Sequence, residues 1–329
     1  MTRILPATDD ALRTAIDELR AGGVVAFPTE TVYGLGARAD DPDAIAAIYR
    51  VKGRPQDNPL IVHVADGDVD GIVAVWPDVA RRLTDAFWPG ALTLVARRHV
   101  EFPDTVSAGL DTVAVRCPDH AVARALIAGA GPLAAPSANR SGRPSPTTAQ
   151  HVVDDLGTSI PYVVDGGPCR HGLESTVVDV TVDPPLVLRP GAIGVDALRD
   201  VAGAIDLHPT VDAPEDDTDA RAPGMRHRHY SPRAELTLLD GDPTRAAERL
   251  RDELAQDPDA HGVAIGPVDS PRVHVFENAT DLAHELYATL RHLDHAAVPR
   301  LFVIAPVATD ATRALRNRLR KAASRRIEV

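Results

Sequence analysis

Two cations of different geometry stand close together in the stretch VKGRPQDNPL, residues 51–60. Lys52 is one of only two lysines in the chain, the other being Lys321, although lysine and arginine together number 35. Arg54 follows two positions later. A lysine ammonium is a compact point charge, whereas a guanidinium is a planar fork that binds two oxygens at once. The two cations therefore indicate two different contacts with anionic oxygens.

Hydroxyl and amide groups are dense in a second stretch, APSANRSGRPSPTTA, residues 135–149. Ser137, Asn139 and Ser145 lie there on a loop rich in glycine and proline, just ahead of a helix expected at residues 147–156. Backbone N–H groups at a helix start and in such loops bind anions readily. We expect this loop to hold phosphate.

Other polar side chains follow or end apolar runs that are typical of strands, in the fragments FPTETVYGLGA, PLIVHV, TVAVRCP, LESTVVD and LRPG. An arginine with apolar strand neighbours, as in TVAVRCP, needs an anionic partner. Ligands of open α/β sheets bind outside the strand ends, so we expect these side chains to converge on one concave site. They are Thr31, His63, Arg116, Ser175 and Arg189.

Helices and strands alternate through residues 1–205 and must position these groups. Helical periodicity at residues 11–19 stops at a glycine pair and leads into a buried strand at 24–27. A second helix begins at Pro42 and places Lys52 at its end. Later strands come with little helix between them, which predicts an α/β catalytic domain with a mixed, twisted sheet.

The chain changes character at residue 206. Residues 206–233 are predicted to be a linker, because 209–223 contain three prolines and many acidic residues but little to bury. Residues 234–329 then alternate strand and helix regularly, which predicts a smaller, doubly wound Rossmann-like domain. That domain lacks a glycine-rich dinucleotide fingerprint, so NAD binding is not predicted.

Composition and charge argue against several classes of protein. A net charge of -12 and an aromatic content of 4% argue against a general nucleic-acid or membrane binder. The two cysteines lack the paired spacing of a zinc or redox motif, and the first residues lack the features of a signal peptide. We therefore expect a cytoplasmic protein with no membrane partner.

Two fragments resemble metal sites without completing them. ADGDVDG has the acid spacing of a calcium loop, yet Pro77 occupies the position of the bidentate glutamate. RHRHYSP places His227 and His229 two residues apart, but no third ligand is evident nearby. No metal site is predicted.

The order of the motifs carries a family resemblance. Lys52 and Arg54 form a K-x-R signature, Ser137 and Asn139 form an S-x-N signature, and PLIVHV and STVVD accompany them. In this order they resemble the threonylcarbamoyl-AMP synthase family of the YrdC-like type, in its long two-domain form. PGMRHRHYSP, residues 223–232, is similar to the linker of that form, so the resemblance covers essentially the whole chain. It implies a YrdC-like catalytic domain followed by a Rossmann-like C-terminal domain.

The resemblance implies a cytosolic nucleotidyltransferase. Such an enzyme joins L-threonine, bicarbonate or CO2, and ATP into threonylcarbamoyl-adenylate and pyrophosphate. A separate transferase would use the product to modify an adenosine beside the tRNA anticodon, and a weak contact of this chain with tRNA stays open. Magnesium is expected to accompany ATP without an assigned protein ligand, because Mg²⁺ commonly binds substrate phosphates.

The resemblance also implies residue roles. The catalytic signature would consist of Lys52, Arg54, Ser137 and Asn139. The L-threonine pocket would be lined by Thr31, His63, Arg116, Ser137 and Ser175, with the arginine holding the carboxylate bidentately. The nucleotide would contact Arg54, Asn58, Thr112, Asn139, Ser145, Arg189 and Tyr230.

Other interpretations stay open. An RNA-binding or ribosome-associated module could use the same basic groove, and its RNA binding would depend strongly on salt but not on threonine. A carbamoyl-transfer enzyme of hydrogenase maturation shares the domain type, but it would carry zinc-finger or acylphosphatase-like segments, which this sequence lacks. Single residues also fit structural roles: Lys52 as a cation at a helix end, His63 as a core histidine and Tyr230 as a linker anchor.

Overall fold

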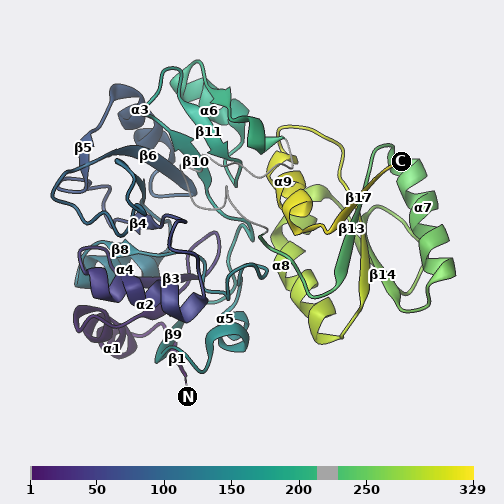
Figure 1. The fold of residues 1–329 in the computed structure, drawn as a ribbon, viewed down its shortest axis with the longest axis horizontal. Coiled ribbons are helices and arrows are strands. Elements are labelled where there is room, and N and C mark those ends of the chain that lie inside the picture. The colour runs from purple at the N-terminus through teal and green to yellow at the C-terminus, as the bar shows by residue number, and fades with distance from the viewer. Residues whose placement is uncertain (1, 213–228) are drawn as a thin grey trace. The chain divides into compact units, whose positions relative to one another are not determined.

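The structure, a computed structural model, describes residues 2–212 and 229–329 (Figure 1). The described residues form two compact units. Unit 1 extends to Ser141 and resumes at Ser145, and unit 2 consists of Gly142–Pro144 and the C-terminal part of the chain to Val329. Each unit has its own sheet.

Unit 1 is built on a mixed, twelve-stranded sheet in the described part of the chain. Strands β4 and β7 run parallel and β6 and β7 antiparallel, which confirms the mixed α/β sheet expected from the sequence. The spatial order is β1 (Arg3–Pro6), β9 (Tyr162–Asp165), β2 (Val25–Phe27), β3 (Gly34–Arg38), β8 (Leu133–Ala134), β4 (Ile61–His63), β7 (Thr112–Arg116), β6 (Leu92–Arg98), β10 (Thr176–Asp179), β11 (Leu186–Arg189) and β12 (Asp206–Leu207), with β5 (Val73–Val75) paired to β6.

Helices pack against this sheet at several places, and α5 lies on β9. Helices α1 and α4 pack against each other, α2 lies on β3, and α3 contacts α6. The helical bounds in unit 1 are α1 (Asp9–Arg20), α2 (Pro42–Lys52), α3 (Asp78–Phe87), α4 (Ala121–Ala130), α5 (Ala149–Leu156), α6 (Val195–Ala202) and the 3-10 turn η1 (Pro209–Val211).

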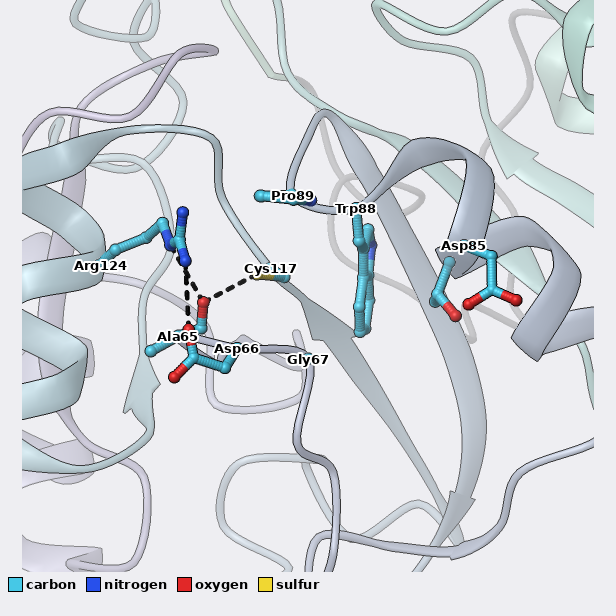
Figure 2. A pocket seen from close by; sticks show the side chains of 9 residues that line it. Ala65, Asp66, Gly67, Asp85, Trp88, Pro89, Cys117 and Arg124 are labelled. Carbon is cyan, nitrogen blue, oxygen red and sulfur yellow. Dashed lines mark hydrogen bonds and ion pairs between the residues drawn. The ribbon is translucent and has the colours of Figure 1, made fainter.

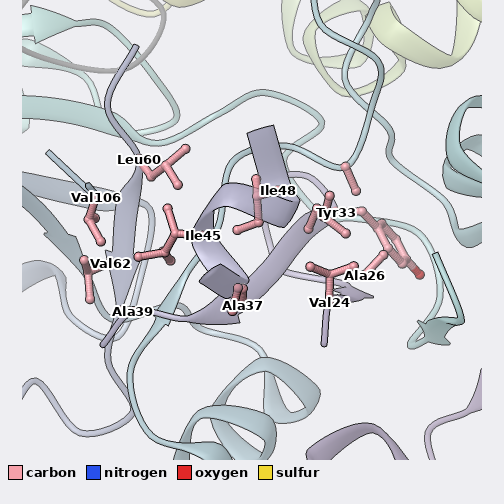
Figure 3. Close-up of a cluster of buried hydrophobic side chains, with 14 of the residues drawn as sticks. Val24, Ala26, Tyr33, Ala37, Ala39, Ile45, Ile48, Leu60, Val62 and Val106 are labelled. Carbon is pink, nitrogen blue, oxygen red and sulfur yellow. The ribbon is translucent and has the colours of Figure 1, made fainter. Parts of the chain in front are cut away.

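One core of unit 1 lies where α2 packs on the sheet (Figure 3). Ile45 and Ile48 are three residues apart, so they share one face of α2, and both are buried together with Val24 and Val62 from the sheet. Each such side chain contributes about 1.5–3 kcal/mol by its burial. The packing therefore fixes the helix that ends at Lys52.

Unit 2 contains a five-stranded sheet in which every pairing is parallel. Its order is β15 (Val273–Phe276), β14 (Ala260–Ile265), β16 (Arg300–Ile304), β13 (Glu235–Asp240) and β17 (Arg325–Glu328). Within this unit, α7 (Pro243–Gln256) lies on one side of the sheet, and α8 (Ala279–His295) and α9 (Arg313–Ala322) lie on the other (Figure 1). This arrangement confirms the doubly wound, Rossmann-like fold.

Hydropathy and helix length bear on membrane crossing. Of the helices in residues 2–212 and 229–329, none is both long and apolar enough to span a bilayer.

Candidate active site

Helix α2 delivers Lys52 to the site with a defined start and end. The Asp41 side chain caps the first turn by accepting hydrogen bonds from the N–H groups of Asp43 and Ala44, at 3.0 and 3.1 Å. Gly53 ends the helix in the left-handed region, at φ 62°, where a residue without Cβ is favoured. Lys52 is the last helical residue, and its side chain is buried.

The ammonium of Lys52 joins the two halves of the signature. Its Nζ donates to the backbone carbonyl of Ser137 and, at 2.5 Å, to that of Asn139. In the same loop, Ser137 Oγ donates to Asn139 Oδ1 at 2.5 Å. Residues 85 positions apart in the chain thus form one cluster, in which Lys52 shapes the loop and places a positive charge beside it.

Arg54 lies on the loop between α2 and β4. Its Nε donates to the carbonyl of Asn58 at 3.2 Å, and its Nη2 donates to the carbonyl of Pro59 at 2.9 Å. Asn58 is 2% exposed, and its side-chain Nδ2 has no hydrogen-bond partner among the described residues. A buried amide of this kind normally meets a partner, so Asn58 presents a donor that a ligand or water can satisfy.

Parallel pairing of β4 and β7 sets His63 directly beside Arg116 at the carboxyl ends of the two strands. The guanidinium of Arg116 donates to Glu30 Oε1 at 2.6 Å, to Thr31 Oγ1 at 2.9 Å and to the carbonyl of Gly90 at 3.2 Å. The anionic partner that Arg116 requires within the chain is therefore Glu30. Both side chains of this ion pair are almost fully buried.

The charge of Glu30 is maintained by Arg116. Burial alone would raise the pKa of the Glu30 carboxyl, but the charge and hydrogen bond of Arg116, with nearby backbone N–H groups, outweigh it and lower the pKa. Glu30 is therefore ionised at neutral pH.

A bulge in β11 brings Arg189 to Ser175. Leu188 is the extra residue between those that pair with β10, and bulges of this kind re-aim side chains next to active sites. Arg189 donates from Nε and Nη2 to the carbonyl of Ser175, at 3.2 and 3.0 Å, and from Nη2 to its Oγ at 3.1 Å. Nearby in the sequence, Glu174 Oε1 accepts from Ser145 Oγ at 2.6 Å.

Two predicted nucleotide contacts are not brought to these clusters by the described geometry. Thr112 begins β7, four residues before Arg116, which places it about 13 Å along the strand from that end. Tyr230 belongs to unit 2, where it is buried, stacks on Tyr287 at 5.5 Å between ring centroids and lies under the Arg318 guanidinium at 5.3 Å. Their assignment to the nucleotide stays a prediction.

Comparison with known proteins covers both units. Residues 17–191 match the family model Sua5_yciO_yrdC, described as telomere recombination, and residues 193–324 match the model of the threonylcarbamoyl-AMP synthase C-terminal domain. The threonylcarbamoyl-AMP synthase of Pyrococcus abyssi is 41% identical over 96% of this chain and 95% of its own length. The chain belongs to the threonylcarbamoyl-AMP synthase family. The family member of Bacillus subtilis is also 41% identical, over 99% of this chain and 97% of its own.

Two solved structures are similar to this chain, one of them to its full length. The crystal structure of P. abyssi Sua5 complexed with L-threonine matches with a TM-score of 0.95 and 39% identity, and each chain is covered completely. E. coli YciO matches 60% of this chain with a TM-score of 0.54 and 24% identity, which shows likeness of fold alone.

The structure describes one of the two histidines in the RHRHYSP fragment. His227 lies outside the described residues, and His229 is buried in unit 2 with its ring 5.7 Å from that of Tyr230. No group of three His, Cys, Asp or Glu side chains in residues 2–212 and 229–329 is placed to hold a metal ion.

A cavity of about 430 Å³ lies beyond the carboxyl ends of β4 and β7 (Figure 2). Arg124 and Asp66, which form an ion pair at 3.1 Å, stand on one side of it, and Trp88 stands on the other. Cys117 lines the cavity, and its thiol donates to the Ala65 carbonyl at 3.1 Å. Burial raises the pKa of the Cys117 thiol, so it is protonated and not a nucleophile at neutral pH. None of the predicted site residues lines this cavity.

The predicted threonine and nucleotide contacts do not include two buried acids of unit 1, Glu30 and Glu174, although the FPTETVYGLGA fragment that contains Glu30 was expected at the site. One signal was present for Glu30, because Arg116 required an anion and FPTETVYGLGA supplies one next to Thr31. No comparable signal marked Glu174, whose contact with Ser145 spans 29 residues.

His63 predicts how the stability of unit 1 depends on pH. Burial, and then the charge of Arg116, lower the pKa of His63 to about 3, so the folded imidazole stays neutral. The unfolded chain binds a proton below pH about 6.5, so the free energy of unfolding should fall by about 1.4 kcal/mol per pH unit for this histidine as the pH drops from 6 to 4.

We expect His63→Gln to remove about one proton equivalent from that pH slope. The measurement is urea unfolding at pH 6, 5 and 4, followed by the fluorescence of Trp76 and Trp88, the only two tryptophans and both in unit 1. His120 and His171, whose pKa values burial also lowers, keep part of the slope in the variant. An unchanged slope in His63→Gln would contradict the neutral, buried state of His63.

Proposed function

We propose that the protein joins L-threonine, bicarbonate or CO2, and ATP to give threonylcarbamoyl-adenylate and pyrophosphate. The observation that carries this proposal is the seating of the Lys52 ammonium against the loop of Ser137 and Asn139. This contact brings the Lys52 cation together with the hydroxyl group of Ser137 and the amide group of Asn139. All three residues lie in the same unit as Arg116, which is ion-paired. Membership of the threonylcarbamoyl-AMP synthase family supports the same reaction.

The reaction needs no covalent bond to the protein. The threonine amine first forms a bond to the carbon of CO2 and loses a proton, which gives a carbamate; bicarbonate supplies the same carbon with loss of water. A carbamate oxygen then attacks the α-phosphorus of ATP. The bond from that phosphorus to the oxygen bridging to the β-phosphate breaks, and pyrophosphate leaves with the electron pair. The protein therefore contributes by holding the reactants in line and by neutralising charge that builds on phosphate oxygens.

Residue roles follow from the clusters. Lys52 would supply a compact charge to phosphate or carbamate oxygens, and Arg54 would bind along the phosphate chain. L-threonine would be held by Thr31, His63, Arg116, Ser137 and Ser175. The nucleotide would be held by Arg54, Asn58, Asn139, Ser145 and Arg189, and the family resemblance alone assigns Thr112 and Tyr230 to it.

Magnesium would enter with ATP. When bound, it would neutralise charge on the phosphates, and we assign it no protein ligand because Mg²⁺ commonly binds through substrate phosphates and water. Downstream, a tRNA threonylcarbamoyl-transferase would consume the adenylate. The adenylate is a mixed anhydride, which makes it an activated donor of the threonylcarbamoyl group. A weak contact of this chain with tRNA is part of the proposal.

The proposed function is tested by pyrophosphate release from ATP and Mg²⁺ with the purified full-length chain. Release should require both L-threonine and bicarbonate, and omission of either should return it to background. Release that is indifferent to threonine, together with salt-dependent binding of RNA by the folded protein, would instead favour an RNA-binding module.

A further inference from the structure

Glu30 is a buried acid beside the predicted threonine contacts, and the reaction scheme gives it no role. Its side chain is 1% exposed, and its Oε1 lies 2.6 Å from Arg116 Nη2. Its second oxygen, Oε2, has no hydrogen-bond partner in the described part of the chain. The carboxylate therefore acts on the pocket chiefly through Arg116.

Glu30 helps to fix the orientation of the Arg116 guanidinium. A guanidinium has five N–H donors, and Glu30, Thr31 and the Gly90 carbonyl each accept one hydrogen bond from it. Two donors remain without a partner among the described residues, which is the number that a bidentate carboxylate uses. The three contacts thus hold the fork in place before a ligand arrives.

Glu30 also sets the charge of the pocket. Paired with Arg116 in a buried setting, it cancels that cation, and His63 beside them is neutral at pH 7. A ligand carboxylate bound to Arg116 would then make the pocket net negative. A ligand that carries its own ammonium restores neutrality, whereas a simple carboxylic acid does not.

We propose that Glu30 is a positioning residue that orients Arg116 and makes the pocket select a zwitterionic amino acid over the matching carboxylic acid. This inference rests on the proposed function, because it takes L-threonine as the ligand. It requires no direct contact between Glu30 and the substrate.

The test is calorimetric binding of two probes to the full-length chain at pH 7.5. One probe is L-threonine, and the other is (R)-3-hydroxybutyrate, which is threonine without its amino group. Glu30→Gln leaves the positive charge of Arg116 uncompensated. The variant should therefore bind L-threonine roughly tenfold more weakly than wild type and bind 3-hydroxybutyrate more tightly. Opposite shifts are expected because the two ligands differ by one positive charge, and a merely structural defect would not produce them.

Two further variants make the comparison specific. Glu30→Asp keeps the negative charge on a shorter side chain. It should therefore bind both probes more weakly than wild type does, while it keeps the preference for threonine. Asp179→Asn removes another buried carboxylate of unit 1, which accepts hydrogen bonds from Thr181 at 2.6 and 2.8 Å, and should leave the ratio of the two affinities unchanged. Tryptophan fluorescence checks the folding of unit 1 in each variant.

The outcomes separate the inference from the proposed function. If wild type binds neither probe, the proposed function fails. If wild type binds threonine but Glu30→Gln weakens both probes equally, Glu30 is only a structural partner of Arg116 and the inference is overturned. If Glu30→Gln does not fold, the Glu30→Asp variant still tests the inference. This variant retains the negative charge, so loss of its preference for threonine would contradict the inference.

Discussion

Methionine in place of Lys52 is expected to reduce threonine-dependent pyrophosphate release at least about a hundredfold, the size found when one group that stabilises transition-state charge is removed. Methionine keeps most of the apolar stem but removes the ammonium. The carbonyls of Ser137 and Asn139 then lose their donor, and the phosphates lose the cation beside that loop. The measurement is pyrophosphate release at saturating ATP, threonine and bicarbonate.

The chain offers a matched control, because Lys321 is the only other lysine and lies on α9 of unit 2. Lys321→Met should release pyrophosphate at the wild-type rate. Isotope labelling of one side-chain atom type in lysine gives one NMR signal for each of the two lysines. The signal that disappears in the Lys321 variant belongs to Lys321, which assigns both signals. ATP with Mg²⁺ should shift the Lys52 signal and leave the other in place. A folded Lys52→Met protein with activity within threefold of wild type would remove Lys52 from the catalytic signature.

The sequence predicted the fold well wherever local signals agreed with the tertiary packing. Helix α2 is an example, since Pro42 and Gly53 mark its ends and its isoleucines share one face. Strand β3 was missed because its sequence, GLGAR, reads as a glycine-rich turn. It forms in the structure by antiparallel pairing with β2 and β8, which no local propensity reveals.

The candidate site divides in the same way. The K-x-R and S-x-N signatures were visible because short spacing and residue type carry them, and the structure joins Lys52 to the loop of Ser137. The pairing of Glu30 with Arg116 was not predicted, because the two residues lie 86 positions apart and meet only through the sheet order. The bulge that turns Arg189 toward Ser175 likewise depends on strand register.

Glutamine in place of Arg116 is expected to lower the free energy of unfolding of unit 1 by about 3–5 kcal/mol and to abolish threonine-dependent pyrophosphate release. Both partners of the ion pair are buried, at 4% and 1% exposure, so the change leaves the Glu30 carboxylate without its cation. Removing one member of a buried pair costs this much because the other remains as an uncompensated charge. Urea unfolding followed by the fluorescence of Trp76 and Trp88 measures the loss.

The double variant Glu30→Gln with Arg116→Gln separates stability from function. With both charges gone, most of the lost stability should return, because neutral amides can pair with each other at the same place. Pyrophosphate release should stay absent, since nothing then binds the threonine carboxylate. The pKa of Glu30 is lowered in the folded protein, so the contribution of the ion pair is present above pH about 4.5 and is lost as the pH falls through the folded value. The gap in stability between wild type and the Arg116→Gln single variant should therefore narrow in acid. A double variant as unstable as the single one would mean that the stranded charge is not the cause, and an active double variant would remove Arg116 from the threonine pocket.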